Sequence, residues 1–262
     1  MLLAVDVGNT QTHLGVFDQE SLIHQWRAST DPRRSADELA LMFGEFLALV
    51  DLSFSRAISG VAIASVVPPA TQQLREMTER YFGFPAIVVE PGVKTGIAVL
   101  TDNPKDVGAD RICNAVGAHA LWPGTAVVIV DFGTAVKVEA LTAAGEFRGG
   151  AIAPGIEISA AALFAAAARL TRVEYVAPPS AIGRNTVAAV QSGIIFGTAG
   201  LVDGLVERVV AELGGSARII ATGGLASVVK DHCKTIELIE PALTLIGLRH
   251  IYELNADAGS ET

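Results

Sequence analysis

The chain has 262 residues, of which 50% are hydrophobic and 18% are charged, and its formal net charge is −9. This composition indicates a globular protein with an ample core and excludes a disordered or fibrous chain. The negative charge argues against nucleic acid as a partner, because nucleic-acid binding normally requires a basic surface. A chain of this length forms one large domain or two domains of ordinary size.

Three local features predict a cytoplasmic protein with no membrane partner. The two cysteines, Cys113 and Cys233, are far apart in sequence, which favours free thiols over a disulfide framework or a zinc site. The apolar run at residues 1–5 lacks a basic start and stops at Asp6, which does not fit a signal peptide. The longest apolar runs, such as residues 160–168, fall short of the roughly 20 residues that span a bilayer.

In chain order, the first half alternates short apolar runs with segments of helical spacing. Apolar residues favour strands at 2–5 and 12–17, joined by a turn at 6–10. Helical spacing continues over residues 35–50, where Ser35 or Asp37 is expected to cap the helix. The remaining expected elements are a strand at 61–67, a helix at 71–81, a strand at 86–89 and a helix at about 110–121.

The same order of elements begins again after Pro123 and Gly124. The expected elements are strands at 125–130, 136–141 and 147–153, helices at about 157–170 and 186–213, a strand at 217–221 and a helix at 243–254. Both halves open with a buried strand and an Asp-x-Gly turn, at Asp6 and, 125 residues later, at Asp131. A repeat of this length indicates duplicated domains, because solenoid repeats have periods of about 20–50 residues. We therefore predict two α/β domains, 1–122 and 123–255, facing one another across a cleft, and a disordered tail at 256–262.

The turn that begins at Asp6 has the composition of a phosphate-binding loop. A carboxylate that ends a buried strand needs a partner, and a metal ion or its water shell is a natural one. Gly8 permits close approach of an anion, and Asn9, Thr10 and Thr12 offer donors to phosphate oxygens. An ordinary hairpin turn explains the same residue types. The second copy at Asp131, Gly133 and Thr134 favours the ligand, since two such turns suit a nucleotide.

Asp110 and Arg111 follow Gly108 at the expected start of a helix. A carboxylate in this place can accept a hydroxyl proton, and a guanidinium can hold a carboxylate with paired hydrogen bonds. A capping aspartate beside a solvated arginine is the simpler alternative on spacing alone. Three further segments, at 149–155, 183–186 and 222–224, suit close approach of a ligand, although packing or capping explains them as well. The five histidines show no metal-binding spacing.

Taken in order, these motifs resemble the type III pantothenate kinases, within the acetate and sugar kinase/Hsp70/actin superfamily. The resemblance covers about residues 1–253. It implies an α/β fold of two duplicated actin-like (ribonuclease H-like) domains with an interdomain cleft. It also implies ATP-dependent phosphorylation of pantothenate to 4'-phosphopantothenate, the first step of coenzyme A biosynthesis. The segments that carry it are 6–10, 102–105, 108–111, 131–134, 149–155, 183–186, 191–193 and 222–224.

The resemblance implies a role for each matching residue. Asp110 is the expected general base, and Asp6 is expected to orient phosphates bound to Mg²⁺. Asp131 is expected to help to hold a monovalent cation, K⁺ or NH₄⁺. Thr186 is expected to reach pantothenate from the partner subunit of a homodimer, at the subunit interface. The expected ATP-binding residues are Asp6, Val7, Gly8, Asn9, Thr10, Gln11, Thr12, His13 and Thr134, and the expected substrate-binding residues are Gly108, Ala109, Asp110, Arg111 and Thr186.

Two departures from the family pattern bear on activity. Val136 and Lys137 stand where the family usually has two threonines, and Thr101 stands where it usually has a tyrosine. One hypothesis is that the Lys137 ammonium replaces the monovalent cation, and the alternative is that strand alternation turns Lys137 outward. A catalytically weak or inactive relative that binds nucleotide is the alternative function. A different small-molecule kinase of the superfamily is a third interpretation, which Thr101 keeps open.

Overall fold

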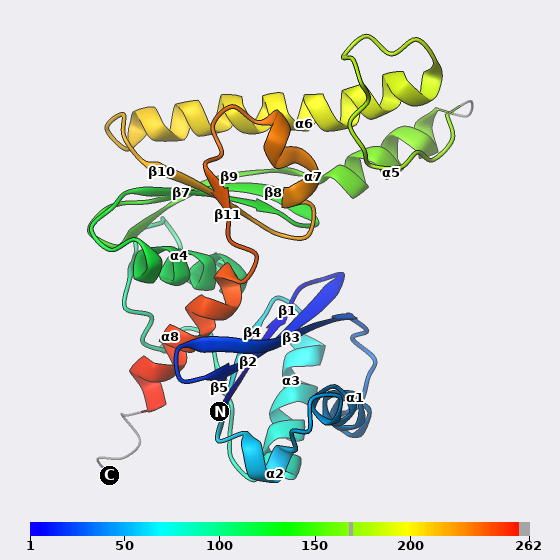
Figure 1. Cartoon of the computed structure of the whole chain (residues 1–262). Coiled ribbons are helices and arrows are strands. Elements are labelled where there is room, and N and C mark those ends of the chain that lie inside the picture. The colour runs from blue at the N-terminus through cyan, green and yellow to red at the C-terminus, as the bar shows by residue number, and fades with distance from the viewer. Residues whose placement is uncertain (168–169, 257–262) are drawn as a thin grey trace. The chain divides into compact units, whose positions relative to one another are not determined.

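The computed structural model describes residues 1–167 and 170–256 (Figure 1). The chain divides into two compact units, each with its own β-sheet and helices. Unit 1 consists of Met1–Ala98, Asp102–Leu121 and the helix that begins at Leu243. Unit 2 consists of Val99–Thr101 and Trp122–Ala242.

Unit 1 contains a mixed five-stranded sheet. The central strand β1 is antiparallel to β2 and parallel to β4, and the strand order is β3-β2-β1-β4-β5. Because β1 is buried on both faces, its sequence is a nearly continuous apolar run that ends at Asp6. The strands are β1 (Leu2–Val7), β2 (Gln11–Asp18), β3 (Ser21–Ser29), β4 (Gly60–Ser65) and β5 (Ile87–Val88).

Unit 2 repeats this topology. Its strand order is β11-β10-β7-β8-β9-β6, in which β7 is antiparallel to β8 and parallel to β10, as β1 is to β2 and β4. The predicted duplication is therefore confirmed strand by strand. The strands are β6 (Ala98–Val99), β7 (Val127–Phe132), β8 (Ala135–Leu141), β9 (Glu146–Pro154), β10 (Arg218–Thr222) and β11 (Leu238–Ile239).

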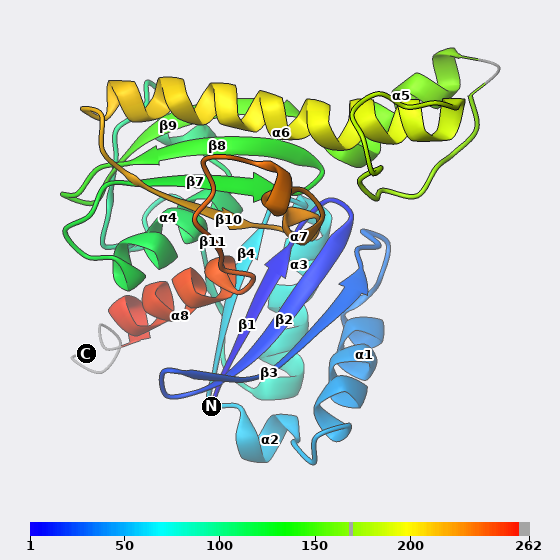
Figure 2. The ribbon, with the colours of Figure 1, turned by 45° about the horizontal axis from the view of Figure 1, so that its top comes forward.

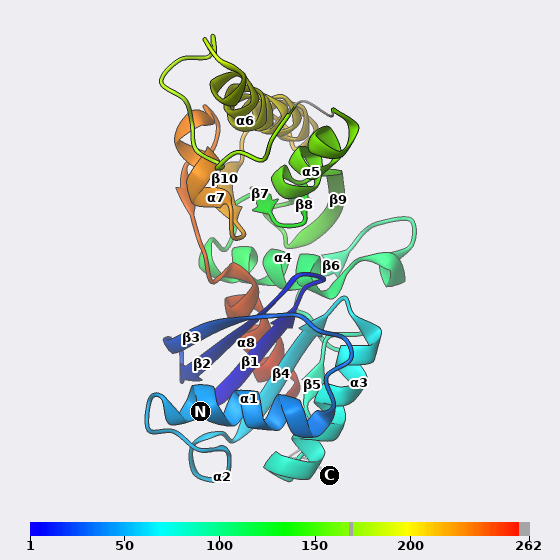
Figure 3. The same ribbon diagram turned by 90° about the vertical axis from the view of Figure 1, so that its right-hand side faces the viewer.

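Helices cover both faces of the sheet in unit 1 (Figure 3). Leu3, Val5 and Val7 of β1 pack in a core with α1 and α3, whereas Leu2 and Ala4 pack in a second core with α4 and α8. By strand alternation, Asp6 belongs to the face that α4 and α8 cover. The helices are α1 (Ala36–Ala48), α2 (Phe54–Ala57), α3 (Pro68–Met77) with a π-helical continuation (Thr78–Phe82), a 3₁₀ turn (Pro104–Asp106), α4 (Ala109–Leu121) and α8 (Leu243–Ala256).

In unit 2 the long helix α6 runs across one face of the sheet (Figure 2). Val128, Val130 and Phe132 of β7 and Val136 and Val138 of β8 point into the core beneath it. The alternate residues of β7 and β8 belong to the opposite face of the sheet. The helices are α5 (Ile156–Ala166), α6 (Thr186–Glu212), α7 (Ala226–Val229) and a 3₁₀ turn (Lys230–His232).

The residues that make up each unit differ from the predicted domains in one respect. The predicted division at residue 122 lies next to the start of the second unit at Trp122, but α8 groups with unit 1 and not with residues 123–255. The reason is packing, because buried Leu245, Leu248 and Ile251 of α8 share a core with β1, β4 and α4. Of the predicted tail, Ala256 ends α8 and 257–262 lie outside the described residues.

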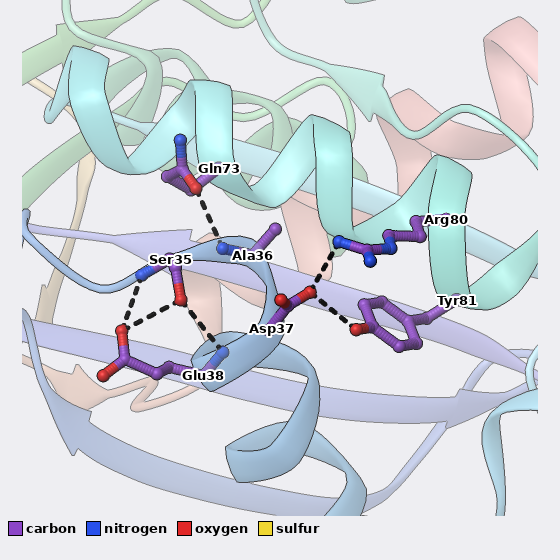
Figure 4. A network of polar contacts seen from close by, with 7 residues as sticks. All are labelled: Ser35, Ala36, Asp37, Glu38, Gln73, Arg80 and Tyr81. Carbon is purple, nitrogen blue, oxygen red and sulfur yellow. Dashed lines mark hydrogen bonds and ion pairs between the residues drawn. The ribbon is translucent and has the colours of Figure 1, made fainter.

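The start of α1 is fixed by a capping box, as the sequence predicted for Ser35 (Figure 4). The Ser35 hydroxyl oxygen accepts from the Glu38 backbone N–H, and the Glu38 carboxylate accepts from the Ser35 N–H at 2.8 Å. Asp37, in the same turn, pairs with Arg80 at 2.8 Å and accepts from the Tyr81 hydroxyl at 2.6 Å. These contacts attach the first turn of α1 to the end of α3.

Replacing Ser35 by alanine should lower the free energy of unfolding by about 1 kcal/mol, because the Glu38 N–H loses its acceptor. Urea denaturation of Ser35→Ala and wild type measures the difference. Ser35→Thr, which keeps the hydroxyl oxygen, should lie close to wild type. Equal stability of wild type and Ser35→Ala would show that the cap contributes nothing.

Among the helices that the structure describes, none has both the length and the apolar composition needed to cross a membrane.

Candidate active site

The first candidate loop is the turn between β1 and β2. Asp6 lies opposite His13 of β2 and beside Ala64 of β4, one residue before the end of β1. The Gly8 N–H donates to the Gln11 carbonyl oxygen at 2.9 Å, which closes the turn. Asn9 and Thr10, at its tip, are exposed. The loop therefore presents backbone and side-chain donors to solvent just above a carboxylate.

Three residues predicted in this loop, Gln11, Thr12 and His13, lie on β2 itself. The Thr12 side chain is buried, and its hydroxyl is 2.9 Å from the hydroxyl of Thr30. The Thr12 hydroxyl therefore faces its strand neighbour and not the tip of the loop. Burial, with a smaller effect of Arg27, lowers the pKa of His13 to about 4. His13 is therefore neutral at pH 7 and offers a phosphate a hydrogen bond but no positive charge.

The structure brings Asp6 and Asp110 to the same region of unit 1. Asp110 is in the first turn of α4, and Cys113, on the same helix, is fully buried. Burial raises the pKa of the Cys113 thiol well above its ordinary value, and the negative charges of Asp6 and Asp110 raise it further. Both carboxylates are thus near one buried sulfur. This places the expected base and the expected metal-orienting residue together.

Gly108 holds the position before α4 for a steric reason. A Cβ atom there would lie 2.6 Å from Oδ1 of Asp110, so a side chain would displace that carboxylate. The preceding 3₁₀ turn is stabilised by a 2.5 Å hydrogen bond from the Asn103 amide to Asp106. Arg111 follows in the first turn of α4 and is partly exposed. The residues predicted to bind substrate in unit 1, Gly108 to Arg111, are therefore consecutive residues at the start of α4.

The second candidate loop is the turn between β7 and β8. The Gly133 N–H donates to the Ala135 carbonyl oxygen at 3.1 Å, with Thr134 at the tip. Gly223, in the turn after β10, has a φ of 93°, and a Cβ atom there would lie 2.7 Å from Oδ1 of Asp131. Only glycine fits this conformation and this spacing. The turn at residues 222–224 therefore packs directly on Asp131.

Lys137 points toward Asp131, so the alternative in which it turns outward is wrong. Its Nζ lies 2.7 Å from Oδ2 of Asp131, and the two residues are paired directly across β7 and β8. Val136, which with Lys137 replaces the usual pair of threonines, is buried in the core beneath α6. Of these two residues, only Lys137 thus lies on the Asp131 face of the sheet.

The glycine segment at residues 149–155 serves packing in unit 2. A Cβ atom at Gly150 would overlap the Val138 carbonyl oxygen, and one at Gly155 would overlap that of Thr134. The Thr101 methyl group lies 3.5 Å from the Cβ position of Gly149. The segment therefore lets β9 approach β8, and it brings Thr101 beside the sheet.

Thr186 is the first residue of α6 and lines a cavity of about 900 Å³ in unit 2. Asn185 caps the helix by accepting from the Ala188 N–H at 2.9 Å. Arg184 lines the same cavity, whose other walls are mainly apolar and come from α5, α6 and the segment between them. The sequence did not predict this cavity, because its apolar residues have the spacing of ordinary helix cores.

Glu139 is a residue for which the sequence predicted no role. It is fully buried on β8, two residues after Lys137 and therefore on the same face of the strand. An ionisable residue within an apolar strand was the available signal. Asp131, Lys137 and Glu139 thus form a row of charged groups on one face of the unit 2 sheet.

Comparisons with known proteins show the family of this chain. The family model described as type III pantothenate kinase matches residues 2–208. A type III pantothenate kinase of Streptomyces griseus is 52% identical over 262 residues, covering 97% of this chain and 98% of the relative.

Two solved structures are similar in fold. A protein from Campylobacter jejuni, described as a Baf family transcriptional activator, has a TM-score of 0.63 at 17% identity, over 97% of this chain and 99% of that one. A polyphosphate/ATP-glucomannokinase from Arthrobacter has a TM-score of 0.51 at 13% identity, over 98% of each chain. At these identities the likeness concerns the fold alone, and it agrees with the predicted pair of actin-like domains. The match of sequence over nearly the full length shows more: this chain belongs to the type III pantothenate kinase family.

Proposed function

We propose that the chain transfers the γ-phosphoryl group of ATP to pantothenate, giving 4'-phosphopantothenate, the first step of coenzyme A biosynthesis. The observation that carries the proposal is the placement of Asp6, near the end of β1, and Asp110, in the first turn of α4, on elements that share one core of unit 1. This arrangement puts a carboxylate able to orient Mg²⁺-bound phosphates and a carboxylate able to accept a proton in one region. The family to which the chain belongs supports the assignment of substrate and reaction.

The residues perform binding, orientation and proton transfer. The tip of the first loop, Gly8 to Gln11, offers donors to the phosphate oxygens of ATP, and Thr134 offers a hydroxyl from the second loop. Asp6 would orient the phosphates that carry Mg²⁺, and that ion would neutralise phosphate charge. Arg111 pairs with the carboxylate of pantothenate.

Asp110 accepts the proton of the pantothenate hydroxyl as its oxygen bonds to the γ-phosphorus. The bond from that phosphorus to the bridging oxygen breaks, and ADP leaves with the electron pair. Little covalent chemistry falls to the protein, because positioning and charge neutralisation supply most of the rate in phosphoryl transfer.

We propose further that the protein acts in the cytoplasm as a homodimer, with Thr186 of the partner contributing to the substrate site. Support comes from unit 2, where large apolar side chains are exposed on α5, α6 and the segment between them. The most exposed is Ile182, at 81%. The predicted partner is pantothenate, with no nucleic acid and no membrane. Both cysteines are free thiols, which fits a reducing compartment.

A second candidate function is that of a nucleotide-binding or regulatory relative with little turnover. The observation that favours it is the ion pair of Lys137 with Asp131 at the second loop. A third candidate, phosphorylation of another small alcohol, is favoured by Thr101 in the place of the family's usual tyrosine.

A coupled assay of ADP release on the purified protein separates the three functions. With ATP, Mg²⁺ and pantothenate, in buffers with and without potassium or ammonium, we expect ADP release that depends on pantothenate and yields its phosphate ester by mass spectrometry. Nucleotide binding without turnover in any buffer would contradict the proposal and support the second candidate. Turnover with another primary alcohol but not with pantothenate would support the third.

A further inference from the structure

The second loop carries a positive charge of its own. Asp131 and Lys137 are cross-strand partners on a hairpin whose turn, Gly133 to Ala135, lies between the paired Phe132 and Val136. The Lys137 Nζ lies 2.7 Å from Oδ2 of Asp131, and the two side chains are only 16% and 12% exposed. The distance is that of a charge-assisted hydrogen bond, and the antiparallel register holds both side chains on one face of the sheet.

A monovalent metal ion does not fit at Asp131 as the residues stand. Oδ2 accepts a hydrogen bond from the Lys137 ammonium at 2.7 Å. The lysine ammonium therefore already provides the positive charge that this carboxylate would otherwise receive from an ion. A potassium ion added here would also stand beside a fixed positive charge in a site with little solvent, where like charges repel strongly.

The alkylammonium group of Lys137 has the properties that an ammonium ion would have beside Asp131. It has a single positive charge and N–H donors, as an ammonium ion does. Because Lys137 is attached to β8, its charge is present at every ion concentration and requires no separate binding equilibrium. Val136 does not disturb the arrangement, because its side chain lies in the core on the other face.

We propose that Lys137 replaces the monovalent cation at the second phosphate loop, so that nucleotide binding and turnover do not depend on potassium or ammonium. The phosphorylation part of this statement rests on the function proposed above. The part that concerns nucleotide affinity does not rest on pantothenate being the substrate.

The test compares wild type with Lys137→Gln in choline chloride and in potassium chloride of equal concentration. Glutamine keeps a donor for Asp131 but removes the charge. Two quantities are measured: the initial rate with pantothenate, and the dissociation constant of a non-hydrolysable ATP analogue with Mg²⁺, by calorimetry. Lys94→Gln, which removes an exposed lysine of unit 1, is the matched control.

For wild type and Lys94→Gln, we expect both quantities to change by less than about twofold between the two salts, because ionic strength is held constant. For Lys137→Gln in choline, the rate should fall by about tenfold or more, since a charge that stabilises the phosphates is lost. Potassium or ammonium should restore most of that loss, whereas sodium should restore less.

Strong potassium activation of wild type, with the same response in Lys137→Gln, would overturn the proposal. The wild-type measurement needs no variant and decides the question even where Lys137→Gln is unstable; Lys137→Arg, which keeps the charge, should remain independent of potassium. If no protein phosphorylates pantothenate, the proposed function fails, and the salt dependence of analogue affinity still tests the role of Lys137.

Discussion

Replacing Asp110 by asparagine should abolish most of the turnover while leaving nucleotide binding almost unchanged. Asparagine has the same shape and keeps an oxygen acceptor, but it cannot take up the hydroxyl proton. Loss of a positioned general base lowers kcat by about 10²- to 10⁴-fold. KM for pantothenate should change much less, because the loss concerns the transition state more than the bound substrate. Steady-state kinetics and calorimetry with an ATP analogue measure the two effects separately.

The chain offers a matched control for this variant in Asp37. Asp37 and Asp110 both hold the second position of a 13-residue helix, α1 and α4 respectively. Asp37→Asn therefore loses the same favourable interaction with a helix N-terminus, worth about 0.3–1 kcal/mol, without touching the first loop. Its kcat should equal that of wild type. Retained turnover in Asp110→Asn would remove Asp110 from the role of base.

Much of the fold could be predicted because the sequence of a single strand shows how far that strand is buried. β1 and β7 are covered on both faces, so each is an apolar run with an aspartate near its end. The similarity of these two runs indicated the duplication. β3 was missed because every second residue of Ser21–Ser29 is exposed and polar residues interrupt the pattern. β6, β5 and β11 have only two residues each, and of these only the region of β5 was predicted as a strand.

The candidate site was predictable where it lies in turns and not where it depends on register. Asp6, Asp110 and Asp131 were found because each stands beside glycine in a turn or at a helix start. The direction of Lys137 was left open, because alternation alone does not say which face of β8 is paired with Asp131. That pairing depends on the length of the hairpin turn: three residues, Gly133 to Ala135, separate the paired Phe132 and Val136, and this fixes Lys137 opposite Asp131.

The place of α8 could not be predicted, because helical periodicity shows that a helix has an apolar face but not which sheet it covers. Two glycines explain why α8 packs against α4 of unit 1. A Cβ atom at Gly247 of α8 would overlap the Cys113 carbonyl of α4, and one at Gly117 of α4 would lie 2.5 Å from the Leu243 carbonyl oxygen of α8. Each helix thus packs on the bare backbone of the other.

Replacing Gly247 by alanine should lower the free energy of unfolding by about 3 kcal/mol, at the upper end for overpacked cores, because the obstacle is backbone and cannot rotate away. Urea denaturation measures the loss, and kcat should fall as well, since α4 carries Asp110. Gly200→Ala in α6 is the matched control. No atom lies within 4 Å of its Cβ position, so alanine should stabilise the protein by about 0.5–1 kcal/mol through helix propensity. If both variants gain stability, the close packing of α4 and α8 is not what joins the last helix to the first unit.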